Sequence, residues 1–380
     1  MVFKDNGTGI RIPNPEFLIP NIGGYMNDVF AVSAAPHIKQ RISVNSVMWQ
    51  VVLALMPALL VGIFFFGIQS LFLTLYAVAA AVFTEALIQK FRKVPITIGD
   101  GSAVVTGILI AFNINSSSPW WLPVLGAVFA IAVGKQIFGG LGFNIFNPAL
   151  LGRAFMMASW PTLMTAGWKF TTPMNNLFQS SINGLRNLPS NVPDVVTSAT
   201  PLGVVKALRD TTQISSDMAN TVMDNLTGMN TLQDLFWGNI GGVIGEVSAA
   251  ALLIGAAYLA WKHIIEWRIP VSYIGTVFVL IYMFGGINGM FSASIMLPIF
   301  HILSGGLILG AFFMATDMVT SPVTKKGRLI FGMGCGILTV VIRLIGGYPE
   351  GVSYSILLMN IAVPLIDRYT TPKPFGEVKK

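Results

Sequence analysis

The sequence predicts an all-α polytopic membrane protein with about ten transmembrane helices. Of its 380 residues, 54% are hydrophobic and only 10% are charged, and the mean hydropathy is +0.71. Ordinary soluble domains carry about 25% charged residues. The 39 glycines and 18 methionines suit helices that pack closely in lipid. Composition therefore excludes a soluble globular domain.

The apolar segments can be counted because a helix needs about 20 apolar residues to cross a bilayer. The predicted spans are 44–66, 70–88, 101–114, 120–138, 145–160, 238–261, 269–285, 295–316, 328–346 and 353–366. Residues 1–43 do not have the pattern of a signal peptide and are expected to form a cytoplasmic N-terminal segment. Residues 367–380 are expected to form a cytoplasmic tail.

Lysine and arginine indicate the orientation, because they are retained on the cytoplasmic side of a membrane. They precede the first span and follow the second, sixth, eighth and tenth spans, whereas 67–69, 113–119 and 285–292 contain none. This pattern predicts that both termini are cytoplasmic and that residues 161–237 form an extracytoplasmic loop. Topology thus explains the net charge of +7, and no nucleic-acid partner is expected.

The two halves of the chain, 44–160 and 238–366, have the pattern of a duplication. Each contains a Ser-Pro pair, an apolar span, a cation, a Gly-Gly pair and a further span: Ser118-Pro119, Lys135 and Gly139-Gly140, then Ser321-Pro322, Arg343 and Gly346-Gly347. Five spans in each half predict two inverted repeats, which typically frame a site with broken helices. Breaks are expected at 143–149 and 301–306.

Acidic residues within or beside apolar spans are candidates for an ion path, because such groups are costly in a membrane. The candidates are Glu85, Asp100, Asp317 and Glu350, and Glu246 is a further acid of this kind. Their carboxylates could bind sodium or pass a proton. Alternatively, Asp100 and Asp317 cap helices, and Glu85 extends towards the inner surface near Lys90.

The fifth span and the residue before it contain the candidate cofactor-binding residues Asn144, Asn147 and Arg153. Pro148 interrupts the backbone hydrogen bonds and leaves amides free to meet a ligand or a neighbouring helix. Arg153 needs an anionic partner, either a flavin phosphate or ring carbonyl, an acidic side chain, or a lipid head group. We expect no catalytic triad and no metal site, because the three histidines are scattered and the lone Cys335 suits helix packing.

A short motif stands out in the long polar loop. Residues 194–202 read Asp-Val-Val-Thr-Ser-Ala-Thr-Pro-Leu and resemble the site at which a flavin transferase esterifies FMN to threonine. The resemblance implies that Thr200 accepts the FMN phosphate within a recognition sequence that includes Asp194, Thr197, Ser198 and Ala199. Ser198 stands where the pattern usually has glycine, and a small residue still fits there.

Four further stretches, 100–107, 142–149, 305–317 and 343–351, resemble a known family. They are similar to the D subunit of the Rnf complex, a ferredoxin:NAD oxidoreductase, which is related to the B subunit of the sodium-pumping NADH:quinone oxidoreductase. Together with the loop motif, the resemblance covers roughly residues 40 to 370. Pro201 and Leu202 after the threonine favour the Rnf member.

The resemblance implies a subunit of an ion-translocating electron-transport complex in the bacterial cytoplasmic membrane, without a complete active site of its own. Covalent FMN would pass electrons between partner subunits, coupled to sodium or proton translocation. The implied partners are an extracytoplasmic FMN subunit, iron–sulfur membrane subunits and a flavin transferase. Relatives also hold non-covalent riboflavin within the membrane, which leaves a second flavin open here.

Two other interpretations remain. A ten-helix solute transporter or channel would have the same inverted repeats but no redox cofactor, and would be colourless when purified. A cofactor-free scaffold would support assembly of a redox complex without a flavin signal on this polypeptide. The transporter interpretation leaves the threonine motif unexplained.

Overall fold

The computed structural model describes residues 43–165, 201–210, 226–238, 241–285, 295–347 and 350–372. The regular elements of these residues are helices, and their β-pairing is limited to an isolated bridge between Asn115 and Val243. The residues from Ser43 onward form one compact unit. The predicted all-helical class is confirmed for this part of the chain.

The first group of helices follows the predicted spans closely. Ser43 begins it, because its hydroxyl accepts the backbone N–H of Ser46 and caps the first helix. Gly67, at φ 82°, separates the first two long helices. The elements are α1 Val44–Phe66, α2 Ile68–Phe91, the 3₁₀ turn η1 Ile98–Asp100, α3 Ser102–Phe112, α4 Trp121–Phe129, its π-helical continuation η2 Ala130–Gln136, α5 Pro148–Ser159 and α6 Pro161–Thr165.

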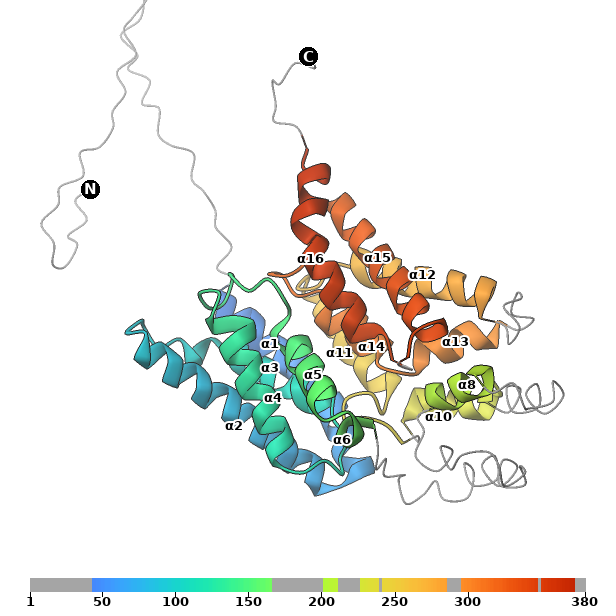
Figure 1. Ribbon diagram of the computed structural model, residues 1–380, viewed down its shortest axis with the longest axis horizontal. Helices are drawn as coiled ribbons and strands as arrows, with labels where there is room; N and C mark the ends of the chain where they lie inside the picture. The colour runs from blue at the N-terminus through green and yellow to red at the C-terminus, as the bar shows by residue number, and fades with distance from the viewer. Residues whose placement is uncertain are drawn as a thin grey trace, which may run out of the picture. The chain divides into compact units, whose positions relative to one another are not determined.

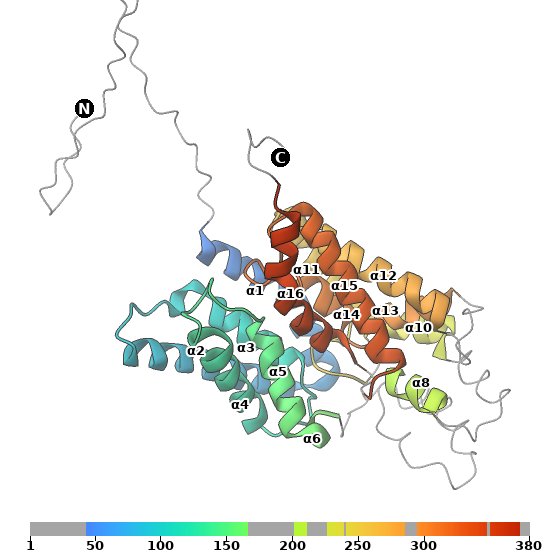
Figure 2. The ribbon, with the colours of Figure 1, turned by 45° about the horizontal axis from the view of Figure 1, so that its top comes forward.

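The second group contains the remaining predicted spans and lies beside the first (Figures 1 and 2). Its helix α11 packs against α1, and its last helix α16 packs against α5. The elements are α11 Ala249–Trp261, α12 Arg268–Phe284, α13 Met296–Leu303, α14 Leu307–Leu309 with its π-helical continuation η5 Gly310–Met314, α15 Lys325–Leu344 and α16 Val352–Thr370. The two groups therefore meet at two places, where α1 packs against α11 and where α5 packs against α16.

The span predicted at 295–316 is a broken helix, as expected from its glycines. α13 and the α14–η5 segment are bent by 67° relative to each other. Gly305 and Gly306 have φ values of 67° and 66°, which a residue with a Cβ adopts only with strain. The break between η2 and α5 also lies where the sequence predicted one.

The span predicted at 238–261 is wrong in its first half, because α11 begins only at Ala249. Residues before it run beside the end of α3, where Ile244 N–H donates to Ile114 O and Gly245 N–H to Phe112 O. Ser248 then caps α11 by accepting the N–H of Ala251. This non-helical segment thus has its own backbone partners and does not need to be helical.

The predicted loop at 161–237 is partly helical in the residues that the structure describes. It contains α6, α8 Pro201–Asp210 and α10 Met229–Trp237. In both views α8 and α10 lie near the second group of helices, and α10 packs against α11 and α13. This part of the loop is therefore attached to the helical body.

Close helix crossings depend on glycine. A Cβ at Gly255 of α11 would lie 2.0 Å from the carbonyl oxygen of Ala54 on α1, and a Cβ at Gly107 of α3 would lie 2.6 Å from Val78 Cα on α2. Small residues allow helices in lipid to approach closely, where van der Waals contact takes the place of a hydrophobic driving force. The abundance of glycine is thus used at the helix contacts.

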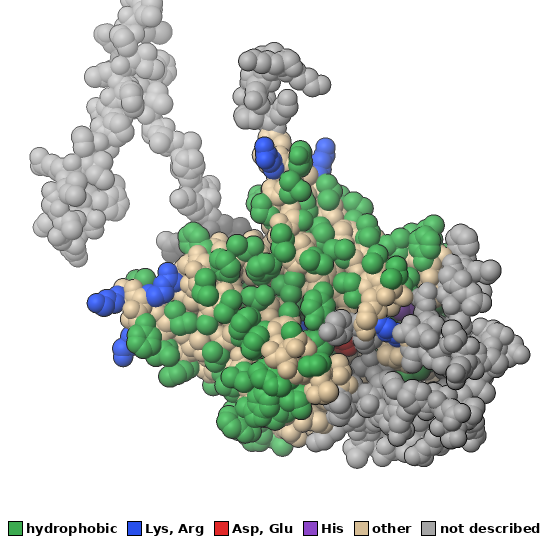
Figure 3. Space-filling model, in the orientation of Figure 1, with side chains coloured by type: hydrophobic (Ala, Val, Ile, Leu, Met, Phe, Trp, Pro, Cys, Tyr) green, Lys and Arg blue, Asp and Glu red, His purple; other side chains and the backbone are tan. Residues whose placement is uncertain are grey.

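The outer surface is that of a membrane protein. Phe64 on α1 and Phe83 on α2 are 81% and 68% exposed. Figure 3 shows hydrophobic side chains over most of the visible face and cations gathered at the far end of α2 and the end of α16. By length and composition, α1, α2 and α15 can each cross a bilayer, and the bent α13–η5 pair makes a fourth such span among the described residues.

Candidate functional site

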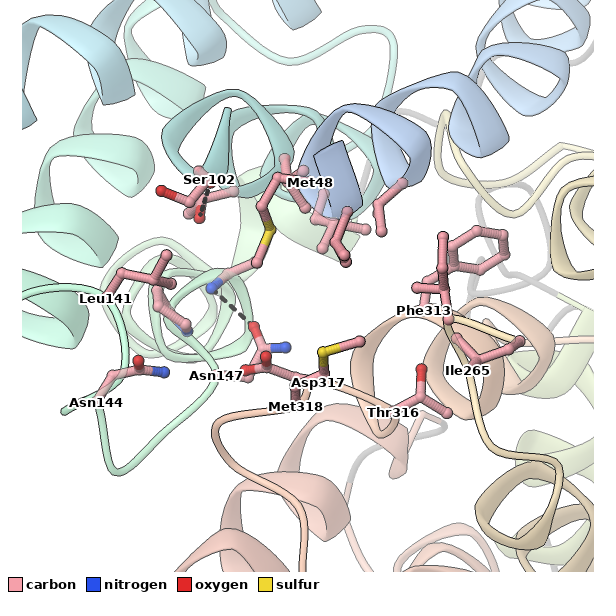
Figure 4. Close-up of a pocket in the computed structure, with 18 of the residues that line it drawn as sticks. Met48, Ser102, Leu141, Asn144, Asn147, Ile265, Phe313, Thr316, Asp317 and Met318 are labelled. Atoms are coloured by element: carbon pink, nitrogen blue, oxygen red, sulfur yellow. Dashed lines mark hydrogen bonds between the residues drawn. The ribbon is translucent and has the colours of Figure 1, made fainter. Parts of the chain in front are cut away.

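A cavity of about 90 Å³ lies between the two groups of helices. Side chains from α1, α3, η2 and the segment before α5 form one side, and residues after α11 and around η5 form the other. Figure 4 shows Ser102, Asn144 and Asn147 facing this space from the first group, with Phe313 and Asp317 from the second. Two π-helical segments border it, and such segments are frequent at functional sites.

Lys135, on η2, places a buried cation on the cavity wall. Its Nζ atom lies 2.6 and 2.8 Å from the two carboxylate oxygens of Glu85 and 2.6 Å from Ser102 Oγ. Gln89 and Gln136 donate further hydrogen bonds to Glu85 Oε1 at 3.2 and 3.1 Å. The pair is fully hydrogen-bonded, as a buried ion pair must be.

This pairing corrects one alternative for Glu85. The sequence left open that its side chain extends to the inner surface near Lys90, but Glu85 is fully buried and Lys90 is exposed. The partner is instead Lys135, 50 residues away in the chain. A buried carboxylate is retained here because a buried ammonium compensates its charge.

Asp100 binds the start of α3, as in the alternative that it caps a helix. Its Oδ1 atom accepts the backbone N–H of Ser102 at 2.8 Å and the Ser102 hydroxyl at 2.6 Å, at the start of α3. The Ser102 hydroxyl is also the acceptor for Lys135. Asp100 is therefore joined to the buried pair through a single hydroxyl group.

Asn147 connects the two groups of helices. Its Oδ1 atom caps α5 by accepting the N–H groups of Ala149 and Leu150, at 3.0 and 3.4 Å. Its Nδ2 atom donates to Met314 O, at the end of η5, over 3.1 Å. The sequence predicted that Asn147-Pro148 leaves backbone amides free for a ligand or a neighbouring helix. In the structure, Asn147 itself binds the amides at the start of α5 and contacts a carbonyl of the neighbouring segment.

Asn144 and Asp317 present polar atoms near the same cavity. The Oδ1 atom of Asn144 is buried and has no hydrogen-bond partner among the described residues, while its Nδ2 atom donates to Phe146 O. Asp317 accepts Val319 N–H at 3.3 Å and Thr320 Oγ1–H at 3.1 Å, and so caps the turn after η5. A buried acceptor without a protein partner is available to a bound water, an ion or a polar ligand group.

Arg153 lies in a second buried cluster. Its Nη1 atom donates to Asn113 Oδ1 at 2.7 Å, and its Nη2 atom forms an ion pair with Glu350. Glu246 Oε1 lies 3.8 Å from the same guanidinium. The sequence left open whether the partner of Arg153 is a flavin group, an acidic side chain or a lipid head group. The structure shows two acidic side chains in this position.

Arg343, on α15, lies beside this cluster and binds the broken helix. It donates to the carbonyl oxygens of His301, Ser304 and Gly305 at 2.5, 3.2 and 3.2 Å. A small cavity of about 30 Å³ adjoins these carbonyls and is also lined by Pro201, Leu202, Glu246 and Glu350. Lys206 of α8 donates to Gly346 O nearby.

The predicted site residues therefore fall into three sets. Thr200, Asp194, Thr197, Ser198 and Ala199 lie outside the described residues. The structure brings Asn144, Asn147 and Asp317 together at the first cavity, with Glu85 and Asp100 joined to it through Lys135 and Ser102. It places Arg153 and Glu350 together in the second cluster.

Sequence reasoning missed Lys135, Arg343 and Lys206 as site residues. The signal for Lys135 and Arg343 was available, because each is a lone cation inside an apolar span and such residues are functional candidates. They were used only to align the two halves of the chain. For Lys206, in a polar loop, the sequence contains no comparable signal.

Comparison with known proteins identifies the family. The model of the NQR2, RnfD, RnfE family matches residues 31–376. The chain belongs to this family. Its family relatives include the D subunit of the Na(+)-translocating ferredoxin:NAD(+) oxidoreductase complex of Acetobacterium woodii, 46% identical over 355 residues that cover 93% of this chain and 98% of that protein.

Two other relatives in the NQR2, RnfD, RnfE family align with this chain over a similar length. The D subunit of the proton-translocating ferredoxin:NAD(+) oxidoreductase complex of Clostridium ljungdahlii is 45% identical over 350 residues, covering 92% of this chain and 97% of that protein. The D subunit of the ion-translocating oxidoreductase complex of Escherichia coli is 36% identical over 367 residues, covering 92% and 99%. Nearly the whole chain thus has the family pattern.

Proposed function

We propose that the chain is the D-type membrane component of an ion-translocating ferredoxin:NAD oxidoreductase complex, and that it passes electrons between partner subunits on flavins. Relatives with such names align over almost their full length with this chain. The partners would be an extracytoplasmic FMN subunit and iron–sulfur membrane subunits. The described residues contain one cysteine, the buried Cys335, so this chain would receive electrons on flavins.

FMN would be esterified to Thr200 by a flavin transferase that recognises Asp194, Thr197, Ser198 and Ala199. The observation that carries this proposal is the position of the next two residues. Pro201 and Leu202 begin α8 and line the cavity at the broken helix, with Gly305, Glu246 and Glu350. A group attached to Thr200 is therefore tethered one residue from that cavity.

The charges of this region suit a phosphate ester. Among the described residues, Arg153 lies by Glu246 and Glu350, Arg343 binds the carbonyls of the broken helix, and Lys206 binds the carbonyl of Gly346. These three cations exceed the two carboxylates by one charge. A phosphate joined to both riboflavin and threonine carries one negative charge. An anion near buried guanidinium groups compensates that excess.

A second, non-covalent flavin would bind at the cavity beside Lys135. The lining combines apolar side chains such as Phe312 and Phe313 with the amides of Asn144 and Asn147, which suits a ring that is apolar at one end and polar at the other. The unpartnered Oδ1 atom of Asn144 would accept a ring N–H. At about 90 Å³, the cavity would admit only one edge of the ring.

The ion path would involve Glu85, Asp100, Asp317 and Glu350. Glu85, Asp100 and Asp317 lie at or near the first cavity, and Glu350 lies in the second cluster. One relative is named for sodium and another for protons at nearly equal identity, so the same scaffold is associated with either ion. Ten spans in two inverted five-helix repeats, with both termini in the cytoplasm, would place these two regions towards opposite sides of the membrane.

The decisive experiment is in-gel ultraviolet fluorescence of the denatured polypeptide, coexpressed with its flavin transferase and followed by peptide mass analysis. We expect a fluorescent band and an FMN-sized adduct on the peptide that contains Thr200. Thr200→Ala should abolish the adduct while the protein still inserts. Thr211→Ala is the matched control, because it removes a threonine of the same loop outside the recognition motif and leaves the acceptor hydroxyl.

Two outcomes would contradict the proposal. Covalent flavin on the Thr200→Ala protein would show that the attachment site is wrong. A correctly inserted parent protein without any adduct, despite an active transferase, would favour the solute transporter or the scaffold.

A further inference from the structure

We propose that the chain binds the head group of an anionic phospholipid in a cavity between the turn that joins α11 to α12 and the start of α15. The cavity has a volume of about 450 Å³, within the range of roughly 300–1,000 Å³ that is usual for ligand pockets. Its wall is formed by residues after α11, residues after η5 and the first turn of α15. Neither Lys135 nor Arg153 lines it, and its proposed ligand requires no flavin.

Two arginines at this cavity share a single carboxylate. Glu266 forms ion pairs with Arg268, at the start of α12, and with Arg328, on α15. Two positive charges against one negative charge leave an excess of one positive charge. The side chains of Arg268, Glu266 and Arg328 are 23%, 24% and 29% exposed. An anion can therefore reach the two guanidinium groups from outside and form charge-assisted hydrogen bonds with them.

Arg328 is held on the cavity wall with donors to spare. Its Nε atom donates to Pro322 O at 2.9 Å, and its Nη1 atom pairs with Glu266. These contacts leave its Nη2 atom without a partner among the described residues. Ser321 adds a hydroxyl group to the same wall. A planar guanidinium fixed in this way suits a phosphate, whose oxygens accept several hydrogen bonds at once.

The other charges near the cavity add to its positive excess. Lys262 follows α11, Lys325 and Lys326 begin α15, and all three are exposed. The two nearby acids bind backbone groups, because Asp317 caps the turn after η5 and Asp367 of α16 accepts a backbone N–H before α15 at 3.1 Å. Three cations against two acids leave the surroundings positive, which attracts anionic lipids.

Exposed tryptophans place the cavity at the level of lipid head groups. Trp261 ends α11 and is 73% exposed, and Trp267 precedes α12 and is 61% exposed. The ammonium of Lys262 lies 5.0 Å from the ring centroid of Trp261, and the guanidinium of Arg268 lies 5.1 Å from that of Trp267. Tryptophan is enriched where a membrane meets water, and basic pockets between helices there bind lipid head groups. These positions favour a lipid phosphate over a soluble one.

The apolar part of the lining suits the glycerol and upper acyl chain of a lipid. Ile264, Ile265 and Met318 line this cavity and also the first cavity, where Figure 4 labels Ile265 and Met318. Met318 is 57% exposed. A lipid held by the arginines would cover this side chain and lie against residues that also form the first cavity.

Native mass spectrometry of the full chain in neutral detergent tests the proposal, because it resolves individual bound lipids. The delipidated protein is titrated with palmitoyl-oleoyl phosphatidylglycerol, with phosphatidylcholine of the same acyl chains, and with inorganic phosphate. We expect the first phosphatidylglycerol to bind at least about fivefold more tightly than the first phosphatidylcholine, the factor that corresponds to one cation near a lipid surface. Inorganic phosphate at the same concentration should not displace it.

Substitutions within the cluster should change this affinity in opposite directions. Arg328→Gln removes the excess charge and should weaken the first phosphatidylglycerol at least about fivefold. Glu266→Gln removes the carboxylate and should strengthen it by a similar factor, which a purely structural role of the ion pairs does not predict. Lys90→Gln is the matched control, because it removes an exposed cation at the end of α2, outside the cavity. Melting temperatures verify folding, and Glu266→Gln decides the test if Arg328→Gln does not fold.

Four results would overturn the proposal. Equal weakening in Arg328→Gln and Lys90→Gln would show diffuse attraction without a site. Equal affinity for phosphatidylcholine would show that the head group is not recognised, and displacement by inorganic phosphate would assign the cavity to a soluble anion. An assembled parent complex that retains no phosphatidylglycerol after detergent exchange would show that a partner subunit covers the cavity.

Discussion

Arg153 on α5 and Ser353 on α16 are 200 residues apart in the chain, and the guanidinium of one donates to the hydroxyl of the other at 2.9 Å. This contact joins α5 of the first group to α16 of the second at a buried charge. The same guanidinium also binds Glu350 and lies near Glu246. The interface between the groups is therefore held by electrostatics as well as by apolar packing.

We expect Arg153→Met to destabilise the protein by about 3–5 kcal/mol, because it leaves two carboxylates buried without their cation. Denaturant titration in detergent micelles measures this change. Lys90→Met, at the exposed end of α2, is the control and should change stability by less than about 0.5 kcal/mol. Equal stability of both variants would show that Glu246 and Glu350 are compensated elsewhere.

The Lys135–Glu85 pair should show strong coupling in a double-mutant cycle. Lys135→Met and Glu85→Leu each leave one buried charge and should each cost about 3–5 kcal/mol, whereas the double variant should cost less than their sum. Unfolding of all four proteins under one condition gives the interaction energy. Additive effects would mean that the two charges are stabilised independently.

The close helix contact at Gly255 predicts that a larger residue there lowers stability. Gly255→Ala places a Cβ against Ala54 O and should destabilise the α1–α11 contact by about 1–3 kcal/mol. Gly275 of α12 has open space around its Cβ position, so Gly275→Ala should be neutral or stabilising by up to about 1 kcal/mol. Melting temperatures in micelles compare the two, and a loss of stability in Gly275→Ala alone would contradict this account.

Asn147 has two roles that substitution separates. Asn147→Ala removes both the cap of α5 and the bond to Met314 O, while Asn147→Ser keeps a good capping residue and loses only the bond. We expect the alanine variant to be less stable than the serine variant by about 0.5–2 kcal/mol, the usual worth of a cap. Thermal unfolding measures both. Equal melting temperatures of the two variants would show that the cap does not contribute to stability.

The helices were largely predictable because membrane-spanning elements follow local apolarity. The first predicted span, 44–66, coincides with α1, and the Ser304-Gly305-Gly306 run correctly indicated a break. The predicted start of the sixth span, at 238, was wrong. Residues 241–248 are largely apolar, yet they hydrogen-bond to the end of α3 instead of forming a helix. Apolarity indicates burial and does not distinguish a helix from a turn segment that has its own backbone partners.

Side-chain partners were predictable only as categories. Arg153 was expected to need an anionic partner, and in the structure this partner is Glu350. The two residues are 197 positions apart in the sequence, so only tertiary packing brings them together. Glu85 was compared with Lys90 because they are near in sequence, and the actual partner approaches from η2. Ionisable residues in apolar spans thus identify where a partner is needed, and the fold decides which one it is.

The guanidinium of Arg343 has a consequence for electrical insulation. A broken helix exposes carbonyl groups that would otherwise recruit water into the membrane, and connected water conducts protons. Arg343 occupies the carbonyls of His301, Ser304 and Gly305 with its own donors. The carbonyls at the kink therefore have protein donors, which lowers their need for water within the membrane.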